Sequence, residues 1–342
     1  METSVVSETE TKMASGPLSG LRILDLSRIL AGPTCTQLMG DYGADVIKIE
    51  KPGTGDDTRS WGPPFLGDDT GTTSGESAYY LSSNRNKRSL AVDITAADGQ
   101  ALIHRLARHC DVVIQNFKVG GLAKYGLDYA GLSASNPGIV YCSISGFGQT
   151  GPNAHRPGYD LLAQAFGGMM SLTGDPEGEP MKVGVGIADV MCGMYAATAI
   201  LAALRHRDAS GEGQHIDLGL VDTQISWLIN SGTNYLVSGE PQHRMGNQHP
   251  NIVPYQVFAT KDGHLIVAAG NDAQFARFCS ILGRAELAIT TEYQTNQMRL
   301  KNRDQLIPLL KAEIGRWERD ALVAALDAAN VPAGAIHDVE DV

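Results

Sequence analysis

Short apolar runs alternate with longer segments of helical periodicity through the first two thirds of the chain. The runs have the length of buried strands and cover residues 21–26, 44–50, 89–94, 111–116, 139–144 and 215–218. The intervening segments, such as 27–43 and 96–109, read as helices; in the first, Pro33 lies near the start and Gly43 at the end. Because strands alternating with helices form a parallel sheet covered on both faces, we expect an α/β fold with an open, Rossmann-like large domain.

The pattern changes after about residue 219. A helix is expected at 225–237, a polar loop at 238–250 and further helices at 273–282 and 304–328. Two apolar runs flank Lys261-Asp-Gly263, which indicates a β-hairpin. The predicted division of the chain is therefore a disordered tail (1–17), a large domain (18–220), a linker helix and loop (221–250) and a smaller α+β domain (251–331).

Composition and charge narrow the possible ligands and locations. The net charge of −11 argues against nucleic acid as the main partner, so an anionic ligand must meet a local basic patch. Five scattered cysteines indicate reduced core residues and a cytoplasmic location. No run has transmembrane length, so no membrane partner is expected, and no His or Cys spacing suggests a metal site.

Basic residues gather in one part of the chain. Most lysines and arginines are solvated, but some of these follow predicted strands and so lie at the ligand-binding edge of an open sheet. Lys51 and Lys118 follow two of the runs, and the turn at 85–88 follows residues 79–81, which we interpret as a strand end. A ligand with several phosphates is therefore one interpretation of the cluster Lys51, Arg59, Arg85, Lys87, Arg88, Lys118 and Lys124.

Asp189 stands between a β-like run at 183–187 and a helix expected at 191–206. Its carboxylate can cap the first turn of that helix. The residues around it are small (Gly184, Gly186, Ala188 and Gly193), so the carboxylate can also act as a covalent nucleophile on an acyl group. In that case, backbone N–H groups after Asp189 can stabilise the developing oxyanion.

Two other motifs are weaker. Gly146-x-Gly148-x-x-Gly151 matches the dinucleotide fingerprint, but Pro152 and a loop follow it instead of a helix, so no nicotinamide is expected. The loop containing Gln248 and His249 lies between the predicted domains, where pockets concentrate.

Several motifs in a fixed order together resemble family III CoA-transferases, the formyl-CoA and carnitine CoA-transferase family. They are residues 24–33, 43–53, 84–89, 111–117, 146–148, 158–160 and 187–189, and the likeness extends from residue 18 to the end of the chain. The resemblance implies transfer of coenzyme A between an acyl-CoA and a free carboxylic acid, with a dicarboxylate favoured, without metal. It implies that Asp189 is the nucleophile, and that the CoA-contacting positions are Ile29, Leu30, Ala31, Lys51, Ser83, Asn84, Arg85, Asn86, Asn116, Phe117, Lys118, Lys124, Pro157, Gly158, Tyr159 and Asp160.

The resemblance also carries expectations about the loop and the assembly. A mobile glycine-rich loop of the family corresponds to the shorter segment Gly246, Asn247, Gln248 and His249. Family members form interlocked homodimers in which a C-terminal segment returns to the first domain. Residues 332–342 are expected to begin such a segment, whose remainder this chain lacks.

Two alternatives stay open. α-Methylacyl-CoA racemases share the fold and the aspartate, and they use a His in a Gly-His-Asp motif as a base. Here the motif reads Gly158-Tyr159-Asp160, and Tyr is a poor base at neutral pH. The other alternative is a CoA-binding protein without turnover.

Overall fold

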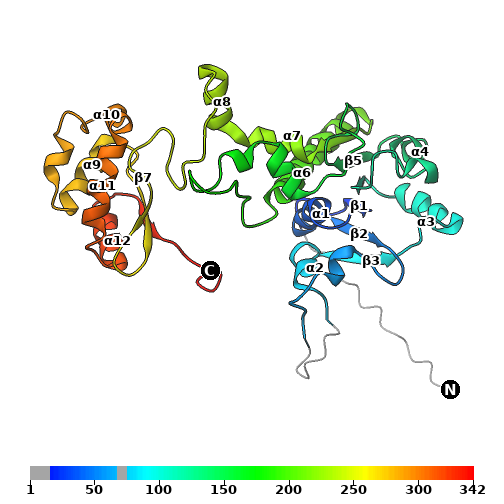
Figure 1. Ribbon diagram of the computed structural model, residues 1–342. Helices are drawn as coiled ribbons and strands as arrows, with labels where there is room; N and C mark the ends of the chain where they lie inside the picture. Colours follow the sequence, from blue (N-terminus) through cyan, green and yellow to red (C-terminus); the bar gives the residue numbers. More distant parts are fainter. Residues whose placement is uncertain (1–15, 68–74) are drawn as a thin grey trace. The chain divides into compact units, whose positions relative to one another are not determined.

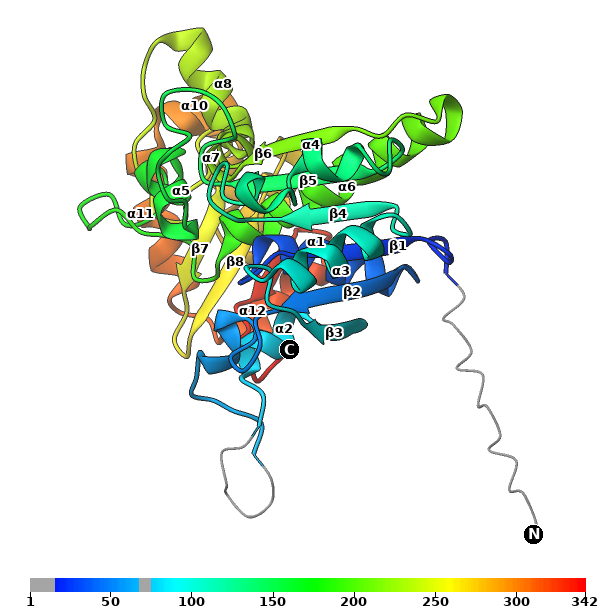
Figure 2. The ribbon, with the colours of Figure 1, turned by 90° about the vertical axis from the view of Figure 1, so that its right-hand side faces the viewer.

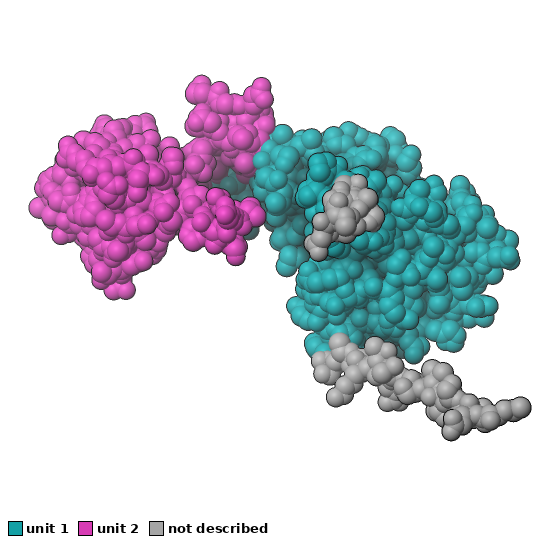
Figure 3. All heavy atoms as spheres, turned by 90° about the horizontal axis from the view of Figure 1, so that it is seen from below, with its two compact units in different colours: residues 1–170, 182–241 teal, residues 171–181, 242–342 magenta. Residues whose placement is uncertain are grey.

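The computed structural model describes residues 16–67 and 75–342 of the 342-residue chain. Most of the tail predicted at 1–17 therefore lies outside the described residues. The chain divides into two compact units (Figure 3). The first runs to Met170 and resumes at Lys182–Pro241, and the second comprises Ser171–Met181 and Gln242–Val342.

A six-stranded sheet forms the centre of the first unit (Figure 2). Neighbouring strands of this sheet pair in parallel, which confirms the predicted α/β class. The sheet order reverses between β1 and β4, and ligands bind at such a switch point in open α/β sheets. In that order the strands are β3 (Lys87–Ala91), β2 (Asp45–Glu50), β1 (Arg22–Asp25), β4 (Val112–Gln115), β5 (Val140–Ser145) and β6 (His215–Gly219).

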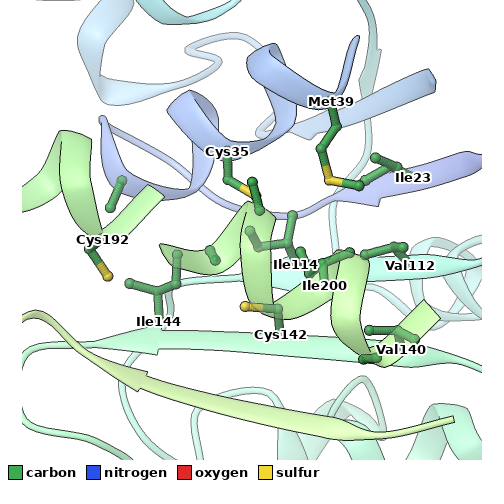
Figure 4. Close-up of a cluster of buried hydrophobic side chains, with 14 of the residues drawn as sticks. Ile23, Cys35, Met39, Val112, Ile114, Val140, Cys142, Ile144, Cys192 and Ile200 are labelled. Atoms are coloured by element: carbon green, nitrogen blue, oxygen red, sulfur yellow. The ribbon is translucent and has the colours of Figure 1, made fainter. Parts of the chain in front are cut away.

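Helices cover both faces of this sheet. Successive strand residues point to opposite faces, so Ile23 joins one core and Leu24 the other. The core that contains Ile23 packs against α1 (Ala31–Asp41) and α6 (Ile187–Ser210), as Figure 4 shows for ten labelled side chains. The core that contains Leu24 includes residues of α3 (Ala97–Ala107) and α4 (Tyr129–Ser133).

Shorter helices complete the first unit (Figure 1). They are α2 (Ala78–Ser83), α5 (Asp160–Phe166), α7 (Leu220–Ile225) and α8 (Ile229–Ser238). Three predictions are wrong here. Residues 79–81 are helical rather than a strand end, residues 183–186 form no strand, and the helix expected at 225–237 is divided by a 3₁₀ turn, Ser226–Leu228.

The second unit has its own apolar core and a three-stranded antiparallel sheet in the order β7-β8-β9. Strands β7 (Tyr255–Ala259) and β8 (His264–Ala268) form the predicted hairpin, and β9 (Ala333–Ala335) adds to it. The helix expected at 304–328 is two helices, because the chain turns at residues 315–318. The helices of this unit are α9 (Asp272–Ile281), α10 (Asn296–Lys301), α11 (Arg303–Ile314) and α12 (Arg319–Ala328).

Within the described parts of the chain, α6 is the one helix whose length and composition would allow it to cross a membrane. Buried residues make up 44% of its apolar window, and Cys192, Ala196 and Ile200 lie in the core of the first unit.

Candidate active site at the carboxyl edge of the sheet

The carboxylate of Asp160 caps helix α6. Its Oδ1 accepts hydrogen bonds from the backbone N–H groups of Ala188 (2.7 Å) and Asp189 (3.2 Å), and its Oδ2 accepts one from Gln164 (2.7 Å). Gly186 is the N-cap residue, and Asp189 is the third residue of the helix. The interpretation of Asp189 as the cap is therefore wrong, because a carboxylate from α5 fills that role.

The Asp189 carboxylate has no hydrogen-bond partner among the described residues, and it lines a cavity. Burial, and to a lesser extent the negative charge of Asp160, raise the pKa of Asp189 to about 7. The carboxylate and the carboxylic acid are thus both populated near neutral pH. A poorly solvated carboxylate without hydrogen bonds is more nucleophilic than a solvated one, which suits attack on an acyl group.

The backbone around Asp189 does not supply the expected oxyanion donors. The N–H groups of Ala188 and Asp189 are bound to Asp160, and the N–H of Val190 donates to the carbonyl of Gly186 at 3.1 Å. The expectation that backbone N–H groups after Asp189 stabilise an oxyanion is therefore wrong.

Small residues bring helix α6 close to α1. A Cβ added to Gly193 would lie 2.6 Å from the carbonyl oxygen of Ala31 and 3.0 Å from the Cβ of Thr34. A Cβ at Gly186 would lie 3.0 Å from Leu30 Cδ2. The glycines that flank Asp189 in the sequence thus place it against the loop that follows β1.

That loop is held in a strained conformation. Ile29 has φ +72°, in the left-handed region that β-branched residues rarely adopt. Its N–H donates to both carboxylate oxygens of Asp56 (3.2 and 3.3 Å), and Asp56 forms a buried ion pair with Lys48 (2.9 Å). Asn116 bonds both backbone groups of Arg28, at 2.9 and 2.7 Å. The loops after β1 and β4 are therefore joined by hydrogen bonds at the switch point.

Two adjacent cavities lie at this edge, with volumes of about 660 and 360 Å³. Arg28, Phe117 and Lys118 line both of them, and the Arg28 guanidinium lies 5.6 Å from the centre of the Phe117 ring. The smaller cavity contains Asp189. Its wall also includes Ile29, Leu30, Ala31, Asn116, Pro157, Gly158 and Tyr159.

The larger cavity carries unpaired positive charge. Lys51, Lys118 and Lys124 line it and are exposed, and none of them forms an ion pair with a described residue. Three acidic residues of the described chain also line it. Asp56 pairs with Lys48 and Glu50 with Arg59 (2.7 Å), and the exposed Asp93 accepts hydrogen bonds from Thr95, so the three lysines outnumber the one described carboxylate that is unpaired. The cavity therefore suits a ligand with several phosphates.

The turn at 85–88 lies elsewhere. Lys87 is paired with Val46 near the start of β2, so the turn stands at the amino edge of the sheet. Its placement at the carboxyl edge is therefore wrong. Arg85 forms an ion pair with Asp41, and the buried Lys87 lies 3.3 Å from Asp25. The four expected CoA contacts in this stretch line neither cavity, and their contact with CoA stays a prediction: Ser83, Asn84, Arg85 and Asn86.

The glycines of the apparent dinucleotide fingerprint serve a close backbone contact. A Cβ on Gly146 would lie 2.5 Å from the Cα of Gly158, and Gly148 has φ +81°. A turn follows Gly151 instead of a helix. The contact between Gly146 and Gly158 brings the loop at 151–159 to the end of β5, where residues 154–159 form part of the wall of the smaller cavity.

Sequence reasoning missed the three other basic side chains of the smaller cavity, namely Arg28, His155 and Arg156. Arg28 and Arg156 each precede a residue predicted to contact CoA, Ile29 and Pro157. A basic residue next to a predicted contact is the feature of the sequence that could have identified them.

The segment Gly246, Asn247, Gln248 and His249 belongs to the second unit. Arg303 donates to the side-chain oxygen of Gln248 (2.9 Å) and to the carbonyl of His249 (2.7 Å). Burial, with the charge of Arg303, lowers the pKa of His249. The segment contributes no residue to the two cavities described above, and its contact with substrate stays a prediction.

Comparison with known proteins identifies the family. Residues 18–342 match CoA-transferase family III. The chain belongs to this family. It is therefore a CoA-transferase, an enzyme whose substrates are CoA thioesters and carboxylic acids, as the resemblance predicted.

Curated relatives and a solved structure agree with the family. The chain is 50% identical over 325 residues to a succinate–glutarate CoA-transferase of Agrobacterium fabrum, covering 95% of this chain and 81% of that protein. It is 44% identical to a succinyl-CoA:glutarate CoA-transferase of Mus musculus, covering 95% of this chain and 73% of that protein. A CAIB/BAIF family protein from Brucella suis has a similar structure, with a TM-score of 0.86, 49% identity and coverage of 96% and 86%.

Proposed function

We propose that this family III CoA-transferase moves CoA from succinyl-CoA, or a similar acyl-CoA, to a free dicarboxylate, with Asp189 as covalent nucleophile. The observation that carries the proposal is the Asp189 carboxylate, which lines a cavity, makes no hydrogen bond with a described residue, and lies beside a second cavity lined by three unpaired lysines. The names of the two curated relatives support the choice of a dicarboxylate.

In the proposed reaction, Asp189 attacks the thioester carbonyl carbon. The carbon–sulfur bond breaks, which leaves an acyl-aspartyl anhydride and CoA thiolate. The thiolate attacks the aspartyl carbonyl of the anhydride, and this step releases the donor acid and leaves an aspartyl-CoA thioester. The acceptor carboxylate then attacks that thioester, and the same two steps in reverse order transfer CoA to the acceptor and free Asp189.

The two cavities divide the acyl-CoA between them in this proposal. The phosphates of CoA bind Lys51, Lys118 and Lys124 in the larger cavity. The pantetheine chain passes Arg28, Phe117 and Lys118, the residues common to both walls, and the thioester meets Asp189 in the smaller cavity.

We also propose a homodimer in a reducing, cytoplasm-like compartment. All five cysteines are buried and free, which fits reducing conditions. The apolar side chains that α8 exposes in the single chain support an association of two copies.

A panel of free acids incubated with succinyl-CoA tests the substrate assignment. We expect new CoA thioesters with dicarboxylates such as glutarate, and succinate released in equal amount, both measured by mass spectrometry. Transfer that favours monocarboxylates, or hydrolysis alone, would contradict the assignment.

Asp189→Asn tests the nucleophile. An amide of nearly the same size cannot form the anhydride, so kcat should fall at least ~10³-fold, about 4 kcal/mol of barrier, while acyl-CoA binding persists. Asp208→Asn is the matched control, since Asp208 is an exposed residue of the same helix and should keep normal activity. Hydroxylamine added during turnover should label Asp189 as a hydroxamate in peptide mass maps. Normal turnover by Asp189→Asn, without a label on this residue in the wild type, would place the nucleophile elsewhere.

A further inference from the structure

The wall of the smaller cavity includes a basic side chain, Arg156, to which the family resemblance gave no role. Arg156 lies on the loop at 151–159, and it lines this cavity together with Asp189. Its guanidinium lies 4.9 Å from the centre of the Phe147 ring and 5.3 Å from that of Phe166. The two rings contact each other edge to face, with centres 5.2 Å apart. Arg156 is thus held by two cation–π contacts, which leave its N–H groups available.

The few polar contacts of Arg156 also leave its guanidinium N–H groups available to a ligand. Its guanidinium forms no ion pair with a described residue, and its hydrogen bond to the side chain of Asn153 is long, at 3.5 Å. A guanidinium offers paired, coplanar donors that match the two oxygens of a carboxylate.

The other cationic side chains of the cavity are less suited to an acid group. Arg28 is already paired with Asp57 at 2.7 Å. Lys118 also lines the larger cavity, where it faces the proposed phosphates. His155 lacks the planar fork of a guanidinium. Arg156 is therefore the side chain of this wall that offers a planar pair of donors and forms no ion pair with a described residue.

We propose that Arg156 binds the second, non-reacting carboxylate of the dicarboxylic substrate and so selects dicarboxylates over monocarboxylates. This inference rests on the proposed function. While one carboxyl group of the substrate reacts at Asp189, the other brings a negative charge into a cavity that already holds one. Without a cation, repulsion and desolvation would disfavour that second charge. A monocarboxylate of equal length has no such group and gains nothing from Arg156.

The experiment compares two acceptors of equal chain length, glutarate and pentanoate, with succinyl-CoA as the common donor. In a double-displacement reaction, kcat/KM for the acceptor reports only the second half-reaction, so effects on the donor cancel in the ratio of the two values. We expect Arg156→Gln to lower kcat/KM for glutarate about 100-fold or more and to leave that for pentanoate within about threefold, since a charge-assisted contact of about 3 kcal/mol is lost. Arg156→Lys should restore part of the glutarate activity.

A second variant separates this role from binding of CoA. Lys51→Gln should raise KM for succinyl-CoA and leave the glutarate-to-pentanoate ratio unchanged, because Lys51 lines the other cavity. Thermal unfolding of both variants checks that they fold. Equal activity of the wild type on the two acids, or an unchanged ratio in Arg156→Gln, would overturn the role of Arg156 while the transferase function stands. No transfer to any acid by the folded wild type would overturn the proposed function and this assignment with it.

Discussion

Two carboxylates at the start of helix α6 have different surroundings and therefore different roles. Asp160 accepts three hydrogen bonds, two of them from the helix backbone. Asp189 accepts none from the described residues and lines the cavity. The residue type is the same, so the difference comes from the hydrogen-bond donors that the fold places around each. Asp160 holds the start of α6 and lines neither cavity, so its contact with CoA stays a prediction; Asp189 is the reacting group in the proposed function.

The pKa of Asp189 predicts how activity depends on pH. Only the carboxylate attacks, so kcat/KM for acyl-CoA should rise with pH, with a midpoint at about 7, and level off above it. The same shift affects stability. A carboxyl group with a raised pKa in the folded state stabilises the fold at low pH, and this contribution is lost as the pH rises from 3.8 to about 7. Rate measurements from pH 5 to 9 check the midpoint.

Asp160→Asn is the companion variant. The Asn side-chain oxygen can still accept from the backbone of α6, but the negative charge beside Asp189 is gone. The midpoint of the pH profile should move to lower pH, by less than the whole shift because burial is the larger cause. A flat profile in the wild type, or an identical midpoint in the variant, would count against Asp189 as the titrating nucleophile.

At the level of elements, the contact between α1 and α6 sets the position of the site. Asp189 is on α6, Ala31 begins α1, and Gly193 is the residue at which the two helices meet. The packing of α6 on α1 thus fixes the position of Asp189 relative to the loop before α1, which carries predicted CoA contacts.

Gly193→Ala should lower stability and activity together. Ala favours a helix over Gly by about 1 kcal/mol, but the added Cβ would lie 2.6 Å from a backbone oxygen, and overpacking costs about 1–3 kcal/mol or more. Because the atom met is a backbone oxygen, the cost should lie at the upper end of that range, so we expect a net loss of about 2 kcal/mol and a fall of about 4–8 °C in the melting temperature. Gly184→Ala is the control, since an added Cβ there meets no atom within 4 Å. Scanning calorimetry checks the melting temperatures of the two variants. A Gly193→Ala variant more stable than the wild type would contradict the close packing of α1 and α6 at this residue.

The secondary structure of short segments was predicted wrongly from the sequence. Residues 79–81 and 183–187 look β-like, because Tyr and Val favour strands and a run of three to five residues is too short to show helical periodicity. Helix α2 begins where the Ser77 hydroxyl accepts from the N–H of Tyr80, and this single cap outweighs local propensity. Because residues 79–81 were interpreted as a strand end, the turn at 85–88 was predicted at the carboxyl edge of the sheet, whereas it lies at the amino edge.

At the level of the whole molecule, α8 contains no buried residue in the single chain. Leu236 and Val237 are 82% and 83% exposed, and Ile229 is 72% exposed. Apolar side chains gathered on one helix mark an interaction surface, and the proposed homodimer supplies the partner.

Light scattering of the purified chain should give the mass of a dimer. Replacing Leu236 and Val237 by Glu should shift the mass toward that of the monomer, because burying unpaired carboxylates in an apolar interface is unfavourable. Glu240→Gln is the control, since Glu240 is an exposed residue just after the helix. A wild-type monomer, or an unchanged dimer in the double variant, would contradict the role of α8.

The sequence by itself predicted the parallel sheet, because its apolar runs have the length of buried strands and alternate with helical segments. It also predicted the hairpin, because a Lys-Asp-Gly turn between two apolar runs joins antiparallel strands. The same reading singled out Asp189 and the two lysines after β2 and β4. Only the tertiary structure decided that Asp160 caps α6 from 29 residues away, that Gly146 meets Gly158, and that Arg156 shares a cavity with Asp189. Periodicity reports which face of an element is buried. It carries no information on which distant segment packs there, because that choice depends on shape and hydrogen bonding between segments that are not neighbours in the chain.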